Sequence, residues 1–307
     1  QEGDVDLALV FGSGKSSPSD PYTLYPSQLD PYYLEPMGLD PVSIAGLPGI
    51  GDDPLAALRK AAGKEPLDGP RALQVEAGVD GLLWSADSRQ LALMLHSVDN
   101  KDRWLVTLDP ARPQLELVHR LTDPGWINWS FNDFDWMPDN RSLWFLSEES
   151  GWSHLYTTSG GRARALTSGR WEASQPVLAA DGQGFLFLCN RARPGDYEVC
   201  HVGAGGGEVR ELTALDGVED FVASPDGRRV LVRHSTSYMP PQLSVVDAAG
   251  GDARQLTDTR SAEFKAREWI QPETVQVPSK HGAGTVWGKY YGPATMEPGR
   301  KYPVVLF

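Results

Sequence analysis

The sequence is poor in cysteine, in paired histidines and in long hydrophobic runs. Its 307 residues include only two cysteines and six histidines. No stretch approaches the roughly 20 apolar residues of a membrane-spanning helix. There is no Cys-x-x-Cys motif, and no two histidines are two or four residues apart, which is the spacing typical of zinc ligands. We therefore expect no transmembrane helix, no metal and no cofactor.

Positive charge is also scarce. The chain has 28 Lys and Arg against 41 Asp and Glu, which gives a net charge of −13. This balance argues against a nucleic-acid partner, because binding to a phosphate backbone depends on basic side chains. It favours solubility and mildly attracts cationic ligands. The sequence begins at Gln1 with no methionine and no signal-peptide pattern, so we expect a processed or trimmed piece.

Turn-forming and aromatic residues are abundant. The chain has 32 Gly, 24 Pro, ten Trp, ten Tyr and nine Phe, a composition typical of many short strands. Residues 135–156 show the pattern most clearly. Trp136 closes one strand, residues 138–140 form a turn, residues 143–147 form an apolar strand, and a third strand begins near Trp152.

Weaker copies of this unit recur along the chain. Turn residues mark the start of each copy at 85–87, 137–139, 180–182 and 224–227. A Leu-Thr pair ends each copy, beginning at Leu121, Leu166, Leu212 and Leu256. A period of about 45 residues with four short strands per copy is typical of β-propeller blades. The fold class is therefore all-β, and four blades fit between residues 71 and 259.

Three regions follow from this reading. Residues 1–70 are an irregular Pro/Gly-rich segment or an incomplete blade, with one helix over residues 54–62. The Gly-Ser-Gly-Lys-Ser-Ser run at 12–17 lacks the first glycine of a phosphate-binding loop, so we interpret it as a flexible turn. Residues 71–260 carry the blades. In residues 261–307 the pattern changes to strands at 272–278, 284–291 and 302–307.

The two cysteines flank a predicted hairpin. If the turn centres on Pro194 and Gly195, Cys189 and Cys200 face each other across two strands. A disulfide there would imply an oxidising compartment, whereas two packed free thiols are the alternative. The first option favours a periplasmic or secreted protein, and the second a cytoplasmic one.

Two motifs resemble a known enzyme family. Ser147-Glu-Glu-Ser-Gly-Trp-Ser-His-Leu-Tyr156 resembles a blade motif of the dipeptidyl peptidase IV-like branch of the prolyl oligopeptidase family of serine peptidases. The runs at 279–282, 287–293 and 301–307 resemble the first strands of that family's α/β-hydrolase domain. The resemblance covers about residues 71–307.

The resemblance implies a function. It implies a propeller that gates a hydrolase domain and filters short, often proline-containing peptides by size. The partners it implies are a peptide substrate and the protein's own hydrolase domain, and a homodimer is one possible assembly. No Gly-x-Ser-x-Gly nucleophile motif occurs, so no catalytic residue is assigned and we expect this chain alone to be inactive. Glu148 and Glu149 are candidates for binding a substrate amine, the alternative being a structural role at a turn.

Other residue patterns leave alternatives open. We expect His154 to make a buried structural hydrogen bond rather than act as a base. Five aromatic residues could stack on a sugar but fit a blade core better: Trp126, Trp129, Phe131, Phe134 and Trp136. Asp133, Asp135 and Asp139 fit solvated turns better than a calcium site. The alternative functions are a non-catalytic binding scaffold of the cell envelope and a propeller glycosidase.

Overall fold

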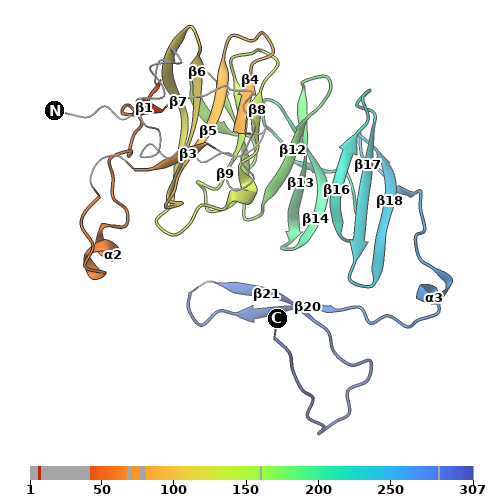
Figure 1. Cartoon of the computed structure of the whole chain (residues 1–307). Coiled ribbons are helices and arrows are strands. Elements are labelled where there is room, and N and C mark those ends of the chain that lie inside the picture. The colour runs from red at the N-terminus through yellow and green to blue at the C-terminus, as the bar shows by residue number, and fades with distance from the viewer. Residues whose placement is uncertain are drawn as a thin grey trace, which may run out of the picture. The chain divides into compact units, whose positions relative to one another are not determined.

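The chain is built almost entirely from antiparallel β-sheets (Figure 1). The computed structural model describes residues 6–7, 42–67, 71–75, 81–159, 161–282 and 284–306. The chain divides into two units, residues 1–176 with 204–207 and residues 177–203 with 208–307. Within the described ranges, no helix is both long and apolar enough to cross a bilayer.

The first sheet has five strands: β3 (Leu73–Val75), β4 (Leu82–Trp84), β5 (Leu91–Ser97), β6 (Asp102–Asp109) and β7 (Arg112–Thr122). The strand order is β3-β5-β6-β7, and β4 also pairs with β5. The partners of β3 are residues 95–97 of β5, whereas those of β4 are residues 91–93. The two short strands therefore pair with successive parts of the same edge of β5. Together they occupy the place of one strand, so the sheet corresponds to a four-stranded blade.

Three further sheets have four strands each, in sequence order. The second sheet contains β8 (Phe134–Trp136), β9 (Leu143–Ser147), β10 (His154–Ser159) and β11 (Arg162–Ala165). The third contains β12 (Ala173–Leu178), β13 (Gly184–Arg193), β14 (Asp196–Gly203) and β15 (Arg210–Glu211). The fourth contains β16 (Val218–Ala223), β17 (Arg229–Thr236), β18 (Met239–Asp247) and β19 (Arg254–Gln255). This repetition confirms the predicted all-β blade fold.

The first repeated sequence anchor forms the same turn in all four of these larger sheets. In each case one N–H donates to the carbonyl three residues before it, and a second hydrogen bond, between residues five positions apart, closes the turn. The residue that donates the first of these bonds has a positive φ: Ser88 at 58°, Asn140 at 54°, Gly182 at 68° and Gly227 at 68°. The preceding aspartate accepts a hydrogen bond from the N–H two residues later, as Asp139 does from Arg141 at 2.9 Å. Small or Asn/Asp/Gly residues are needed here because few other side chains tolerate this conformation.

The second anchor, Leu-Thr, fixes the outer edge of three sheets. The threonine hydroxyl accepts a hydrogen bond from a strand N–H: Thr167 from Leu155 at 3.0 Å, Thr213 from Val199 at 2.9 Å and Thr257 from Leu243 at 2.9 Å. The leucine N–H bonds to the carbonyl of that same strand residue at 2.7 Å each time. The anchor therefore pairs with the strand by side chain and backbone together.

Both faces of a sheet contribute to the core. In β5, Leu91, Leu93 and Leu95 lie in one apolar cluster, while Ala92 and Met94 lie in another. The second cluster includes residues of the second sheet, such as Phe145. A third cluster joins side chains of the third and fourth sheets. Alternate side chains of a strand point to opposite faces, so a strand that is apolar throughout indicates neighbours on both sides.

The segment before the first sheet packs on its free face. β1 (Asp6–Leu7) pairs antiparallel with β2 (Val42–Ser43). Val42, Ile44, Leu47 and Ile50 are buried in the same cluster as β5. The predicted helix is present but shorter, as α2 (Ala56–Ala61), and Leu55 occupies its N-cap position without a side-chain cap.

Other predictions for residues 1–70 cannot be compared with the structure. The phosphate-loop-like run at 12–17 lies outside the described residues. Leu7 belongs to β1, and residues 8–41 also lie outside the described residues.

The C-terminal segment contains the predicted hairpin but not the third predicted strand. β20 (Glu273–Pro278) pairs with β21 (Thr285–Tyr290), and a short helix not expected from the sequence, α3 (Ala262–Lys265), precedes them. Residues 302–306 are not a strand, so that prediction is wrong. The described residues give this apolar run no partner strand, and Val304, Val305 and Leu306 are 84%, 89% and 97% exposed.

Candidate functional site

The candidate site lies at the turn between β9 and β10. Ser147 ends β9, and the chain turns through Gly151, whose φ is 88°. The Gly151 N–H bonds to the Glu148 carbonyl at 2.8 Å, and the Glu149 N–H donates to the Ser147 hydroxyl at 3.3 Å. These bonds place the two predicted glutamates at the start of the turn, at one end of the second sheet.

Glu149 pairs with a histidine from the first sheet. Its Oε2 lies 2.7 Å from Nε2 of His119, which is on β7. The His119 ring packs on Phe145 with centroids 4.7 Å apart, and Phe145 stacks on Tyr156 at 5.6 Å. Burial lowers the pKa of His119, against the opposing effect of Glu149. The neutral ring therefore donates from Nε2 to the carboxylate.

Tyr156 completes this group. Burial, followed by the negative charge of Glu149, raises the pKa of Tyr156 to about 12. The phenol therefore stays protonated at neutral pH and can donate to the Glu149 carboxylate. Glu149 accepts hydrogen bonds from two largely buried rings, so its side chain has a structural role at the turn.

Glu148 has different neighbours. Burial raises its pKa, and the carboxylates of Glu172 and Asp123 add to this shift. A backbone hydrogen bond from Asn128 and the charge of Arg103 oppose it. Negative charge is therefore in excess around Glu148, and a cation bound there would stabilise the carboxylate. The two adjacent glutamates thus differ in their surroundings, and those of Glu148 are the more suitable for an amine.

Arg103 holds the end of β9, next to Glu148, in place. It lies on β6 and is 1% exposed. Its guanidinium donates to the carbonyl of Leu146 at 2.8 Å and to that of Phe131 at 3.1 Å, and it also contacts the side-chain oxygen of Asn132. These bonds connect the first sheet to the segment before β8, which fixes the position of β9 where Glu148 begins.

The aromatic residues near the site have two different environments. Phe134 and Trp136 are 5% and 8% exposed and belong to the core, as predicted. Trp126 is 63% exposed, so its assignment to the core is wrong. Trp129 bonds through its indole N–H to Asn100 at 2.8 Å. The exposed Trp126 lies three residues after Asp123, and its backbone N–H donates to the Asp123 carboxylate at 2.9 Å.

His154 is a structural residue, as predicted. It is 1% exposed. Its Nε2 lies 3.1 Å from the Gly169 carbonyl, and its Nδ1 lies 3.0 Å from the Thr167 hydroxyl. A carbonyl only accepts, so Nε2 carries the proton and Nδ1 accepts from the hydroxyl. Burial lowers the pKa of His154, consistent with this neutral state.

Two of the three aspartates considered for calcium accept hydrogen bonds from nearby backbone N–H groups. The Asp139 carboxylate accepts the N–H groups of Arg141 and Ser142 at 2.9 and 2.8 Å. Asp135 accepts its neighbour's N–H, that of Trp136, at 2.7 Å. Among the described residues, the group whose ligand atoms converge as in a metal site is a different one, Cys189, Cys200 and Glu211.

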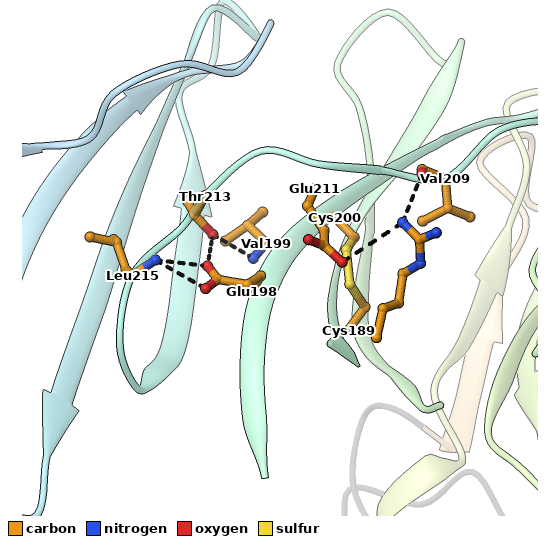
Figure 2. The surroundings of a disulfide bond; sticks show 9 residues. Cys189, Glu198, Val199, Cys200, Val209, Glu211, Thr213 and Leu215 are labelled. Atoms are coloured by element: carbon orange, nitrogen blue, oxygen red, sulfur yellow. Dashed lines mark hydrogen bonds and ion pairs between the residues drawn. A yellow bond between two sulfur atoms is a disulfide. The ribbon is translucent and has the colours of Figure 1, made fainter. Parts of the chain in front are cut away.

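The structure joins Cys189 and Cys200 by a disulfide with Cα atoms 6.0 Å apart (Figure 2). The predicted register is wrong, because Cys189 lies opposite Glu198, and Cys200 lies opposite Phe187. An irregularity between Cys189 and Arg193 shifts the register. The cysteines are therefore diagonal neighbours on one face of the sheet, and their separation still lies within the range of disulfides.

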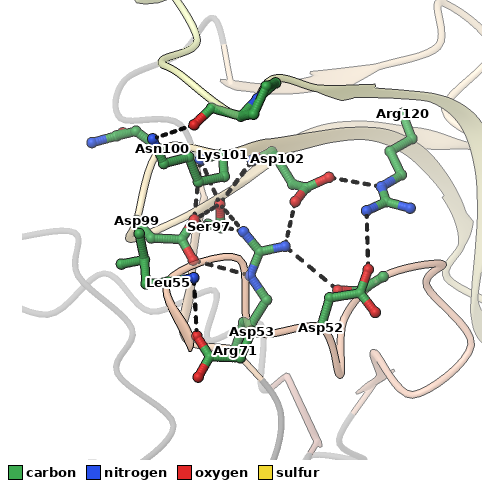
Figure 3. A network of polar contacts seen from close by, with 12 residues as sticks. Asp52, Asp53, Leu55, Arg71, Ser97, Asp99, Asn100, Lys101, Asp102 and Arg120 are labelled. Carbon is green, nitrogen blue, oxygen red and sulfur yellow. Dashed lines mark hydrogen bonds and ion pairs between the residues drawn. The ribbon is translucent and has the colours of Figure 1, made fainter. Parts of the chain in front are cut away.

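A buried ionic network lies at the end of the first sheet where β5 turns into β6 (Figure 3). Arg71 binds Asp99 through two nitrogens, at 2.6 and 3.1 Å, and also pairs with Asp102. Arg120 donates to Asp102 at 2.7 Å. Burial opposes ionisation of Asp99, but hydrogen bonds from Arg71 and Ser97 outweigh it and lower the pKa of Asp99. The sequence reasoning missed this network, because partners 28 and 31 residues apart follow no motif.

The second unit has its own hollow, of about 390 Å³. Trp287 and Lys289 of β21 line one side, and residues 235–238 of the fourth sheet line another. The Tyr291 hydroxyl lies 2.7 Å from the Ser237 hydroxyl across this region. The segment of the hairpin therefore contacts the end of the fourth sheet through polar groups of Lys289 and Tyr291.

Comparison with known proteins gives consistent results. Residues 73–241 match the family model described as the dipeptidyl peptidase IV N-terminal region. The uncharacterized peptidase YuxL of Bacillus subtilis (strain 168) is 27% identical over 132 residues, which cover 41% of this chain and 18% of that protein.

Two solved structures share the fold. The structure of a putative dipeptidyl aminopeptidase IV from Bacteroides ovatus superposes with a TM-score of 0.60 at 17% identity, over 76% of this chain and 37% of that one. Porphyromonas gingivalis dipeptidyl peptidase 4 gives 0.60 at 18% identity, over 76% and 34%. The chain thus spans little more than a third of the solved structures and less than a fifth of the curated relative.

Proposed function

Because the chain belongs to the family of dipeptidyl peptidase IV N-terminal regions, we propose that it is the gating and substrate-filtering propeller of a serine peptidase of the prolyl oligopeptidase type. The match spans more than half of the 307 residues. The observation that carries the proposal is the succession of repeated four-stranded sheets followed by the β20–β21 hairpin. A hydrolase domain would supply the nucleophile, which this sequence lacks.

The substrate class follows from the site at the β9–β10 turn. Glu148 lies near Glu172 and Asp123, and its pKa is raised first by burial and then by these carboxylates. A peptide with a free amino terminus would bring a positive charge to this group and relieve the repulsion. Glu149 would keep Glu148 in place through its contacts with His119 and Tyr156. The exposed Trp126, whose backbone N–H binds Asp123, is an apolar surface in the same segment as that carboxylate.

The partners and compartment are part of the same proposal. The partners are a short, often proline-containing peptide and the protein's own hydrolase domain, with a homodimer as the assembly to be measured. The disulfide supports an oxidising compartment, either the periplasm or the exterior. The net charge of −13 disfavours nucleic acid as a partner.

The test compares two proteins from the same gene. One is the 307-residue chain, and the other extends it through the downstream hydrolase region. With a dipeptidyl chromogenic substrate, we expect turnover only from the extended protein and complete inhibition by a serine-directed phosphonate. Phosphonate-sensitive turnover by the 307-residue chain alone, or an extended protein without turnover, would contradict the proposal.

A second measurement tests the role of Glu148. In the extended protein, Glu148→Gln should lower kcat/KM for a substrate with a free amino terminus by about tenfold, as expected for one charge-assisted hydrogen bond. Glu208→Gln, at an exposed position of the second unit, is the matched control and should change nothing. If E148Q left kcat/KM unchanged, the amine-binding role would be wrong while the peptidase assignment would stand.

The competing function is a non-catalytic binding scaffold of the cell envelope. A propeller is a platform, and the fold alone does not determine what it binds. The hairpin after the fourth sheet favours the peptidase, because a scaffold has no need of a hydrolase-like entry segment. The same pair of assays separates the two, since a scaffold would give no turnover in either form.

A further inference from the structure

Three potential metal ligands meet on one face of the third sheet. Cys189 lies on β13, Cys200 on β14 and Glu211 on β15, so they come from three successive strands. Cys200 is directly opposite Glu211, and Cys189 is the diagonal neighbour of Cys200 across the other ladder. Their sulfur and carboxylate oxygen atoms all lie within 4.8 Å of one another, and Figure 2 shows Glu211 beside the two sulfurs.

In the disulfide form the two sulfurs are bonded to each other and are poor ligands, because thiolates are the forms that bind metals. Reduction would leave two thiols and one carboxylate in the same place. Cysteine sulfur and carboxylate oxygen both bind zinc, with bonds of about 2.3 Å to sulfur and about 2.0–2.2 Å to oxygen. Tetrahedral geometry with these bond lengths sets ligand atoms about 3.5–4 Å apart, so the two sulfurs must separate after reduction, whereas a Glu211 oxygen already lies within 4.8 Å of both.

We propose that reduction of the Cys189–Cys200 disulfide creates a site for one thiophilic divalent cation of the zinc class, ligated by Cys189, Cys200 and Glu211. With a phosphine as the reductant, the phosphine takes the oxygen of one water and becomes its oxide, while the two cysteines gain the two protons. Binding of the cation then releases these protons as each thiol becomes a thiolate. The fourth coordination position is left for water, as in open zinc sites.

The surroundings favour a cation at this point. Both cysteines are 0% exposed, so two thiolates without a counter-ion would be costly. Glu211 pairs with Arg191, whose Nη1 lies 3.8 Å from Oε1, and both side chains are more than a third exposed. Such an exposed pair contributes little and gives way easily to a metal. Arg191 keeps its hydrogen bond to the Val209 carbonyl at 3.0 Å.

The neighbouring carboxylate, that of Glu198, already accepts hydrogen bonds from other groups. Its oxygens accept the Leu215 N–H at 3.0 and 3.1 Å and the hydroxyl of Thr213. Figure 2 shows these bonds on the side of Glu198 away from the disulfide. The third ligand is therefore Glu211, which makes it the residue that distinguishes this site from simple binding to two thiols.

The experiment uses the 307-residue chain. The chain is reduced with a phosphine in guanidinium, refolded without oxygen, and titrated with Zn²⁺ by calorimetry and with Co²⁺ by absorption. Thiols counted in denaturant establish the oxidation state of each sample, and far-UV circular dichroism establishes that it has folded. The oxidised chain, with the identical sequence, is the first control.

We expect one Zn²⁺ per reduced chain, a thiolate-to-cobalt absorption band, and affinity that rises with pH because protons are released. Glu211→Gln should weaken binding at least tenfold with the band retained, whereas Glu208→Gln should bind as the wild type does. The Cys189→Ser/Cys200→Ser chain should bind no metal.

Three results would overturn the proposal: equal binding by the reduced and oxidised chains, unchanged affinity in E211Q, or a reduced chain that stays unfolded with and without Zn²⁺.

Discussion

The second sheet and the C-terminal hairpin are both antiparallel β-structure, but they differ in what covers them. Every residue of β9 is buried, and Phe145 at its centre is 0% exposed. In β20 and β21 no residue is buried. Among the described residues, none after Val246 is buried. The difference teaches that a strand of this chain becomes buried only where an adjacent sheet covers its face, so we expect stability to follow that covering.

The largest effect should come from removing a core ring. Phe145→Ala deletes a side chain that contacts His119 and Tyr156. We expect a loss of about 3–5 kcal/mol in the free energy of unfolding, measured by urea denaturation. Val304→Ala, at a position 84% exposed, should stay within about 0.5 kcal/mol. Similar losses for the two variants would contradict the contrast between covered and uncovered strands.

The buried ionic network should give a comparable but slightly smaller loss. Arg71→Met leaves Asp99 and Asp102 without their cation at a site where Arg71 is 2% exposed. Removing one partner of a buried pair costs about 3 kcal/mol or more. Arg300→Met removes the exposed pair with Glu297 and should cost less than about 1 kcal/mol. Equal costs in thermal or chemical denaturation would show that the Arg71 network does not hold the segment before β3.

His154 connects stability to pH. Its pKa is lowered by burial from an ordinary value of 6.5, so the unfolded chain takes up a proton at a higher pH than the folded chain does. The stabilisation is therefore complete above about pH 6.5 and is lost as the pH falls through the folded-state pKa.

His154→Gln should cost about 1–3 kcal/mol at neutral pH, because two buried hydrogen bonds are disturbed. It should also flatten the decline in stability between pH 7 and 5. His281→Gln, at an exposed position, controls for the change of residue type. An unchanged acid decline in H154Q would mean that His154 does not contribute to it.

The smallest effect is expected at the hairpin. Tyr291→Phe removes the hydroxyl that lies 2.7 Å from Ser237. Tyr291 is 59% exposed, and water can replace the bond, so the free energy of unfolding should change by less than about 0.5 kcal/mol. A loss above 1 kcal/mol would show that this contact holds the hairpin in place.

Local chemistry explains which features could be predicted from the sequence. Asp139 and Asn140 form a turn through the Asp139 carboxylate and the backbone conformation of Asn140. Thr167 accepts a hydrogen bond from Leu155, a strand residue nearby in the chain. Both depend on nearby residues and recur with the repeat, so the pattern was sufficient to predict them.

The features that the sequence did not reveal depend on distant parts of the chain. Arg71 meets Asp102 only because the strands of the first sheet pair. The irregularity after Cys189 changes the cysteine register without any turn signal. Trp126 looks like a core residue by type, but no sheet covers it. Residues 302–306 look like a strand, yet no described strand pairs with them.

Hydrogen exchange of the backbone amides tests the central claim most directly. If sheet-to-sheet packing carries the fold, amides of β9, β13 and β17 should exchange slowly and with similar free energies. Amides of β20 and β21 should exchange much faster, because an isolated two-stranded hairpin is marginally stable. Protection of the hairpin equal to that of β9 would contradict the account.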